Sequence, residues 1–324
     1  MISPLTRRPG TWALALTVSA VAIGMACFAA GGADAPAALQ EPRPIAPGFK
    51  VVTLWPAGSP ALKALEGADK GEDLTMSKSQ PDHVQGVKNV HNPSIELHLA
   101  PRDKVNGMAV VLAPGGGNTQ LVVGTEGTEP SEWLNGLGVS TFIERYRLRP
   151  YTSDGDALAD TKRSIRMVRA HAKEWGVDPH RVGIMGFSAG GEQAAWVALK
   201  FDNGDANASD PVERESSRPD FVVLVYPGWR RMDLSNVPKD APPAFLTTAG
   251  LDDASHARAT VDFYNAWINA KIPVEMHIYG HGGHGNGIKP RNGIPFGSWP
   301  QRFVEWVTDL GMMKPAGAPA AAAR

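Results

Sequence analysis

Short apolar runs alternate with helical patterns along most of this chain, and each run has the length of a single buried strand. The expected strands cover residues 95–99, 109–113, 139–143, 182–186, 221–226, 244–248 and 274–279. Strands that alternate with helices predict an α/β fold, in which helices cover both faces of a mostly parallel sheet.

Three of the segments between or after these strands repeat apolar residues three or four positions apart, as one face of a helix does. The three stripes are Leu158, Thr161, Ile165, Val168, Ala172 and Trp175; Val261, Tyr264, Trp267 and Ile268; and Phe303, Trp306, Val307 and Leu310. We expect them to face the core, the first helix ending before Gly176. The polar stretches 202–219 and 229–242 predict loops that are too short for a lid domain, which favours an open site.

Both ends of the chain differ from this pattern. Arg7-Arg8, an apolar run from Trp12 to Ala30 and the small residues that follow are typical of an export signal over residues 1–35, and an uncleaved signal anchor is the alternative. Residues 36–48, rich in Ala and Pro, predict a linker that buries no core, and residues 314–324 predict a disordered tail of similar composition. One large domain over residues 49–313 remains.

The only cysteine, Cys27, lies inside the expected signal, so cleavage after it would leave no disulfide. The stretch Gly24-Met25-Ala26-Cys27 resembles a bacterial lipoprotein box, which would place a lipid anchor on Cys27. We therefore expect a periplasmic or secreted protein that meets a membrane only through its signal or this anchor. A formal net charge of -1 and a pI near 6.8 give no basic surface for nucleic acid.

The stretch Gly186-Phe187-Ser188-Ala189-Gly190-Gly191 stands between an expected strand and a segment with helical composition. A serine there lies on a tight turn, and glycines two residues away on each side avoid a clash. The turn would expose the Ser188 hydroxyl, and the N–H of Ala189 would point at an oxygen that gains charge during acyl transfer. The alternative is a small-residue turn with an incidental serine.

A serine nucleophile needs a base, and the base needs an orienting acid. Asp252-Asp253 follow the expected strand 244–248, and His281 and His284 follow the strand 274–279. The ends of parallel strands collect such groups, and the order Ser, acid, His is that of α/β-hydrolases. The acids could instead cap a helix, and the histidines could be a surface pair or a metal site. Zinc is disfavoured because no cysteine or third ligand stands at ligand spacing.

His284 has a glycine on each side and can approach Ser188, so we take it as the base and His281 as a loop residue. Further upstream, Leu112-Ala113-Pro114-Gly115-Gly116-Gly117 follows the expected strand 109–113. Its successive glycines leave backbone N–H groups open to a developing oxyanion. A phosphate loop is the rival, but it needs Gly-Lys-Ser/Thr where this chain has Asn118-Thr119-Gln120.

From Val110 to about Gly285 the sequence resembles the secreted α/β-hydrolase esterases of the acetyl xylan esterase and feruloyl esterase type, which are often loosely labelled xylanases. The matching motifs are Pro114-Gly115-Gly116-Gly117, Glu132-Trp133-Leu134, Tyr146-Arg147-Leu148, Asp160, Trp175-Gly176-Val177-Asp178, Gly186 to Gly191, and His277-Ile278-Tyr279 with Gly283-His284-Gly285. Upstream, Leu54-Trp55-Pro56 and Val90-His91-Asn92-Pro93 fit its N-terminal strands.

The resemblance implies that Ser188 is the nucleophile, Asp253 the acid and His284 the base. It also implies that Gly116, Gly117 and Ala189 donate to the oxyanion, and that no cofactor or metal is needed. In this family a Val-Pro pair usually stands two residues after the acid, and here Ala254-Ser255-His256-Ala257 stands instead. Asp252 therefore stays an alternative acid.

These observations predict an exported serine carboxylesterase that removes small, acetyl-like groups from a carbohydrate or related alcohol through an acyl-enzyme. A serine peptidase of the prolyl-oligopeptidase type would need a propeller domain for which this chain has no room. A xylan-acting glycosidase would need two carboxylates facing each other across the substrate. A non-catalytic sugar-binding relative would not need Ser188, Asp253 and His284 together.

Overall fold

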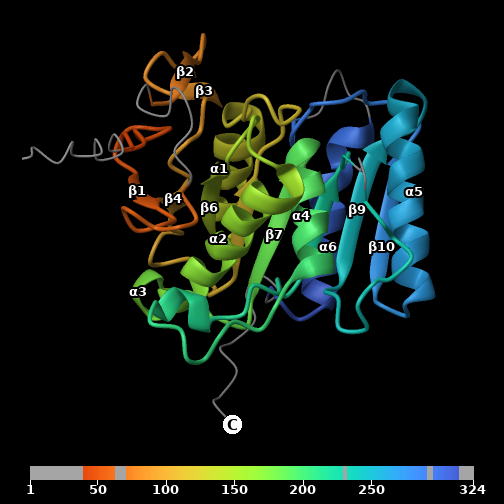
Figure 1. Ribbon diagram of the computed structural model, residues 1–324. Coiled ribbons are helices and arrows are strands. Elements are labelled where there is room, and N and C mark those ends of the chain that lie inside the picture. Colours follow the sequence, from red (N-terminus) through yellow and green to blue (C-terminus); the bar gives the residue numbers. More distant parts are fainter. Residues whose placement is uncertain (1–38, 63–70, 229–231, 290–294, 314–324) are drawn as a thin grey trace, which may run out of the picture. The chain divides into compact units, whose positions relative to one another are not determined.

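The computed structural model describes residues 39–62, 71–228, 232–289 and 295–313, and the chain from Ala37 onward forms one compact unit (Figure 1). The expected export signal, with Cys27, and the expected tail lie outside the described residues. Within the described residues, the helices are all too short or too polar to cross a bilayer.

The centre of this unit is an eight-stranded sheet with the strand order β1-β4-β6-β5-β7-β8-β9-β10. Its strands are β1 (Lys50–Thr53), β4 (Ser94–His98), β5 (Ala109–Ala113), β6 (Ser140–Arg145), β7 (Val182–Phe187), β8 (Val222–Val225), β9 (Ala244–Ala249) and β10 (Val274–Tyr279). β4 pairs antiparallel with β1 and β6, and the remaining neighbours pair in parallel. The seven strands expected from the sequence are all present, and the prediction of a mostly parallel sheet is confirmed.

Three N-terminal strands were not expected. The first is β1, at the edge of the central sheet. The other two are β2 (Asp73–Met76) and β3 (Val84–Lys88), which pair with each other in a separate two-stranded sheet. These strands are short and partly exposed, so their sequence lacks the continuous apolar run of the central strands. The assignment of residues 54–56 and 90–93 to strands is wrong, because the first segment follows β1 and the second lies between β3 and β4.

Helices cover both faces of the sheet (Figure 1). They are α1 (Glu129–Gly136), α2 (Leu158–Ala170), α3 (Ala172–Trp175), α4 (Ala189–Lys200), α5 (Ala254–Asn269) and α6 (Trp299–Asp309). Trp133 of α1 packs edge-on against Trp299 and Phe303 of α6, so these two helices lie together. Phe245 of β9 packs against the same aromatic group.

The expected apolar stripes lie mainly toward the core, but the structure differs from the prediction in two details. The first stripe is divided between α2 and α3, because the backbone leaves the helical conformation at His171. The left-handed Gly176 ends α3, as its position after the stripe predicted. In α5, Trp267 is fully buried, whereas Ile268 is 48% exposed and does not belong to the buried face.

Arg147 and Asp160, both part of the family motifs, join the end of β6 to α2. The guanidinium donates through Nε and Nη2 to the two Asp160 oxygens, each at 2.8 Å, and the Trp55 indole donates to Oδ1 at 2.7 Å. Burial raises the pKa of Asp160, and the Arg147 and Trp55 contacts oppose that rise. The matched buried pair therefore has a structural function here, since removal of either partner would leave a buried charge.

The expectation that residues 36–48 are a linker that buries no core is wrong for the part that the structure describes. Ile45 is fully buried in the core, and its backbone N–H donates to the Glu96 carboxylate. Arg145 donates to the Arg43 carbonyl at 2.6 Å, and Asn92 donates to the Gln40 carbonyl at 3.2 Å. The composition of residues 36–48 did not indicate this burial, because the side chains that bind the segment belong to distant strands and loops.

Truncation of Ile45 tests where the folded domain begins. We expect Ile45→Ala to lower the free energy of unfolding by about 2–5 kcal/mol, because it leaves a cavity in the core. Urea unfolding measures the loss. The control is Glu41→Ala, an exposed position in the same segment, which should stay within about 0.5 kcal/mol of the unmodified protein. Equal stability of both variants would contradict the assignment of residue 45 to the core.

Candidate active site

Ser188 lies at the junction of β7 and α4, at the carboxyl end of a central strand. Its backbone has φ 51° and ψ −116°, which is an unfavourable conformation for a residue with a side chain. The surroundings hold it there: the Ser188 N–H donates to the Val225 carbonyl at 3.0 Å, and its carbonyl accepts from Gly228 at 2.8 Å. The sharp turn that the sequence predicted is therefore present.

Glycines make the turn possible through close backbone packing. A Cβ atom on Gly190 would overlap the carbonyl of Ala113 at the end of β5. A Cβ atom on Gly186 would overlap the backbone of Gly190. The motif glycines thus let α4 begin directly against β5 and β7.

The structure brings Ser188, His284 and Asp253 together, although 96 residues separate the first two. His284 follows β10, and its Nε2 lies 2.8 Å from the Ser188 Oγ. Its Nδ1 lies 2.8 Å from Oδ2 of Asp253, which follows β9. The His284 side chain is 35% exposed and that of Asp253 only 9%, so the chain of hydrogen bonds runs from solvent into the protein.

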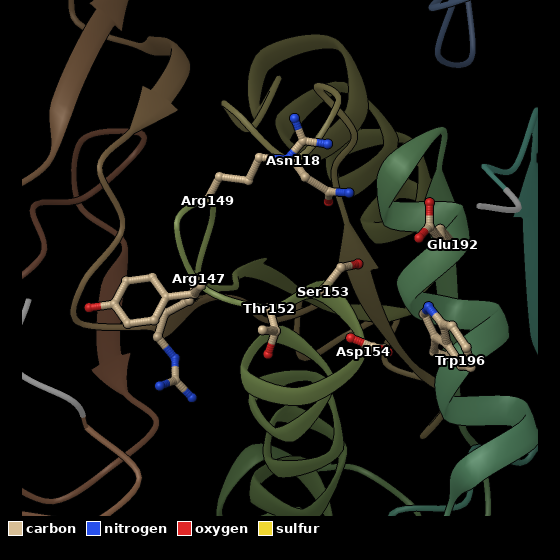
Figure 2. Close-up of a pocket in the computed structure, with 9 residues that line it drawn as sticks. Asn118, Arg147, Arg149, Thr152, Ser153, Asp154, Glu192 and Trp196 are labelled. Atoms are coloured by element: carbon tan, nitrogen blue, oxygen red, sulfur yellow. The ribbon is translucent and has the colours of Figure 1, made fainter. Parts of the chain in front are cut away.

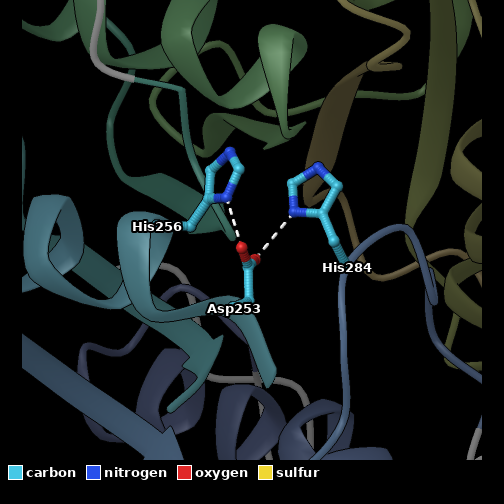
Figure 3. Close-up of side chains that lie close together, drawn as sticks. All are labelled: Asp253, His256 and His284. Carbon is cyan, nitrogen blue, oxygen red and sulfur yellow. Dashed lines mark hydrogen bonds and ion pairs between the residues drawn. The ribbon is translucent and has the colours of Figure 1, made fainter. Parts of the chain in front are cut away.

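The acid has a second imidazole partner that the sequence analysis did not identify. His256 lies one turn further along, at the start of α5, and its Nδ1 donates to Oδ1 of Asp253 at 2.5 Å. Its ring also stacks on His284 with the centroids 4.1 Å apart (Figure 3). The Asp-x-x-His spacing at a helix start was the available signal. Both oxygens of Asp253 therefore accept from an imidazole.

These three side chains could also hold a metal ion. Their ligand atoms lie within 4.8 Å of one another, and histidine with carboxylate is a common set for zinc. The two hydrogen bonds to Asp253 account for the same geometry without an ion.

A buried carboxylate that sequence reasoning also missed supports the glycine loop. Glu126 accepts from the backbone N–H of Gly115 at 2.7 Å and from the Tyr226 hydroxyl at 2.9 Å. Burial raises its pKa, while these two hydrogen bonds and His284 oppose the rise. The ring of Tyr226 lies 4.7 Å from that of His284, so Glu126 connects the glycine loop to the neighbourhood of the imidazole.

The loop after β5 lies directly against Ser188. A Cβ atom on Gly115 would stand 2.7 Å from the Ser188 Cβ, and its own N–H is already used by Glu126. Gly116 and Gly117 follow with φ of 132° and 67°, and Ala189 is the first residue of α4. The three backbone N–H groups expected to bind an oxyanion thus belong to the two segments that flank the serine.

Two further candidates from the sequence are His281 and Asp252. His281 lies exposed in the loop after β10, as its assignment to a loop residue implied. The side chain of Asp252, the alternative acid, lies outside the described residues. The expected capping role of the acid pair is not seen for Asp253, because it makes no side-chain cap to α5.

Several known proteins are similar in sequence to this chain. Residues 96–253 match the model of the BD-FAE family. An acetylxylan esterase of Xylanibacter ruminicola is 30% identical over 64% of this chain and 45% of that protein. An endo-1,4-beta-xylanase B of Butyrivibrio fibrisolvens is 27% identical over 56% of this chain and 33% of that protein. The chain thus spans less than half the length of these two relatives.

Solved structures give the same fold. The acetyl ester-xyloside bifunctional hydrolase of Caldicellulosiruptor lactoaceticus superposes with a TM-score of 0.68 at 27% identity, covering 83% of this chain and 99% of that one. A propionate-bound esterase of Thermogutta terrifontis has a TM-score of 0.57 at 22% identity over 71% of this chain and 93% of that one, which supports the fold alone. The mostly parallel sheet and these superpositions show the α/β-hydrolase fold, and residues 96–253 are similar to the BD-FAE family.

Proposed function

We propose that this protein is a serine carboxylesterase that removes small acyl groups, acetyl above all, from the hydroxyl groups of carbohydrates or related alcohols. The observation that carries the proposal is the unbroken hydrogen-bonded chain from Ser188 through His284 to Asp253. The acetylxylan esterase relative and the acetyl ester-xyloside hydrolase support acetyl esters of carbohydrates as the substrate class.

Ser188 would attack the ester carbonyl while Nε2 of His284 takes the hydroxyl proton. Asp253 accepts from Nδ1, which fixes the imidazole tautomer and stabilises the cation that forms. The alcohol leaves with a proton from His284, and an acyl group remains on Ser188. Water activated by the same imidazole then releases the acid and restores the serine.

Negative charge develops on the carbonyl oxygen during both steps. The N–H groups of Gly116, Gly117 and Ala189 are the proposed donors, since they stand on the two segments beside Ser188. Glu126 would hold the glycine loop in place, because its carboxylate accepts from the Gly115 N–H.

The glycosidase alternative receives no support from the site. A glycosidase needs two carboxyl groups on opposite sides of the scissile bond. Here both oxygens of Asp253 accept from histidines. The chain covers only 33% of the relative named as a xylanase, so that name does not transfer a glycosidase activity to this chain.

Replacement of the nucleophile tests the mechanism. We expect Ser188→Ala to lower kcat for p-nitrophenyl acetate on the order of a millionfold, with the fold retained. Ser235→Ala, an exposed serine in a loop, is the matched control and should keep full activity. On acetylated xylan the unmodified protein should release acetate and no reducing sugar. Reducing ends without acetate, or near-normal hydrolysis by the Ser188 variant, would refute the proposal.

His256 offers a test of how Asp253 is held. His256→Phe keeps a flat ring beside His284 but removes the hydrogen bond, and we expect kcat to fall about tenfold. His256→Asn places an amide N–H near the position of Nδ1, and we expect kcat to stay within about threefold. Steady-state kinetics on p-nitrophenyl acetate compare the two variants. If the Asn variant were the more impaired, ring stacking rather than the hydrogen bond would matter.

We also propose that residues 1–35 direct export, on the strength of Arg7-Arg8 and the apolar run that follows. In a Gram-negative host, the full chain should deliver esterase activity to the periplasm, the medium or the membrane fraction. A chain that lacks residues 1–35 should keep the activity in the cytoplasm. Cytoplasmic activity from both chains would exclude an export signal.

A further inference from the structure

A pocket of about 390 Å³ opens beside the proposed nucleophile, and the proposed reaction does not use it (Figure 2). It adjoins the site on two sides. Asn118 directly follows the glycine loop, and Glu192 lies in the first turn of α4, where its N–H donates to the Ser188 carbonyl at 3.0 Å. The pocket thus shares α4 and the glycine loop with the proposed site.

The lining offers donors and acceptors on facing walls. Asn118 and Arg149 can donate from the loops after β5 and β6, while Glu192 and Asp154 can accept from α4 and from the turn before α2. Among the described residues, no carboxylate forms an ion pair with the exposed Arg149. Its guanidinium is therefore available to a ligand.

One polar atom of the lining is buried and lacks a partner. Trp196 is 5% exposed, and its Nε1 has no hydrogen-bond partner among the described residues. Figure 2 shows this nitrogen on the edge of the ring that is turned toward Glu192. Buried indole N–H groups usually have a partner, so an acceptor on a ligand would satisfy this one.

The walls are fixed before any ligand arrives. The Arg149 N–H donates to the Asn118 carbonyl at 3.0 Å, which joins the two sides of the mouth. Gln193 donates to the Ser153 Oγ at 2.7 Å and ties the α4 wall to the turn before α2. A preformed pocket loses little conformational entropy when it binds.

We propose that this pocket binds the sugar ring whose hydroxyl carries the ester, so that it is the alcohol subsite of the esterase; this inference rests on the proposed function. Sugar hydroxyls both donate and accept, which matches the donors and acceptors of the lining, and one of them can accept from the Trp196 indole N–H. An acyl chain would need an apolar lining instead, because it could not satisfy these polar groups.

The test compares two esters with the same acyl group. kcat/KM is measured for an O-acetylated xylo-oligosaccharide and for p-nitrophenyl acetate, and their ratio isolates the contribution of the sugar. We expect Arg149→Ala to lower this ratio about tenfold, the cost of one charged hydrogen bond. Glu192→Gln should lower it similarly. Arg102→Ala is the matched control and should leave the ratio unchanged. This exposed arginine follows the carboxyl end of β4, which lies beside the start of β6, whereas Arg149 follows the end of β6.

The outcomes separate the two proposals. An unchanged ratio in Arg149→Ala would overturn the subsite, and so would hydrolysis of p-nitrophenyl acetate without any hydrolysis of the sugar ester. An unmodified protein that is inactive on both esters would instead overturn the proposed function. Thermal unfolding shows whether Glu192→Gln is folded. If that variant does not fold, the ratio measured for Arg149→Ala alone decides whether the subsite exists. Weaker binding of the sugar ester to Ser188→Ala/Arg149→Ala than to Ser188→Ala, measured by calorimetry, would support the subsite without turnover.

Discussion

The backbone of Ser188 is the constraint on which the other features of the site depend. A residue in such a conformation costs about 1–3 kcal/mol and persists only when its neighbours determine it. Here the neighbours are the Val225 carbonyl, the Gly228 N–H and the close approach of Gly190 to the end of β5. The sheet therefore holds the hydroxyl toward His284, and a relaxed turn would release that contact.

Two carboxylates support this arrangement through their hydrogen bonds. Glu126 is buried and binds the glycine loop and Tyr226, whereas Asp253 is nearer the surface and binds two histidines. Because Tyr226 and His256 are both ring neighbours of His284, each carboxylate also influences where the imidazole lies. The position of the base is thus determined by packing as well as by its own hydrogen bonds.

The central strands and the three residues around the proposed reaction could be predicted because their signals are local. Each buried strand is a continuous apolar run, and Ser188 and His284 stand among glycines directly after such runs. Parallel strands then bring their carboxyl ends to one edge, so local motifs imply a shared site. β1 to β3 and the anchored segment around Ile45 lack such runs, since their burial depends on partners far away in the sequence.

The roles of Glu126 and Tyr226 could not be predicted either, because they too depend on partners far away in the sequence. Nothing near either residue in the sequence marks it, and 100 residues separate the two ends of their hydrogen bond. His256 is different, because its spacing from Asp253 was visible but has meaning only once the backbone turns into α5 at Ala254. A polar residue gains its role from what the fold places opposite it, which composition and periodicity do not encode.

The segment after Asp253 is where this chain departs from the motif of the esterases that it resembles, and the structure shows a consequence. α5 begins at Ala254, immediately after Asp253, so His256 lies one turn away and faces the carboxylate. The side chains of a Val-Pro pair carry no donor for the second oxygen. With both oxygens bound, the carboxylate cannot rotate without breaking a hydrogen bond. That restriction favours one tautomer of His284, with the proton on Nδ1, and leaves Nε2 free to accept from Ser188.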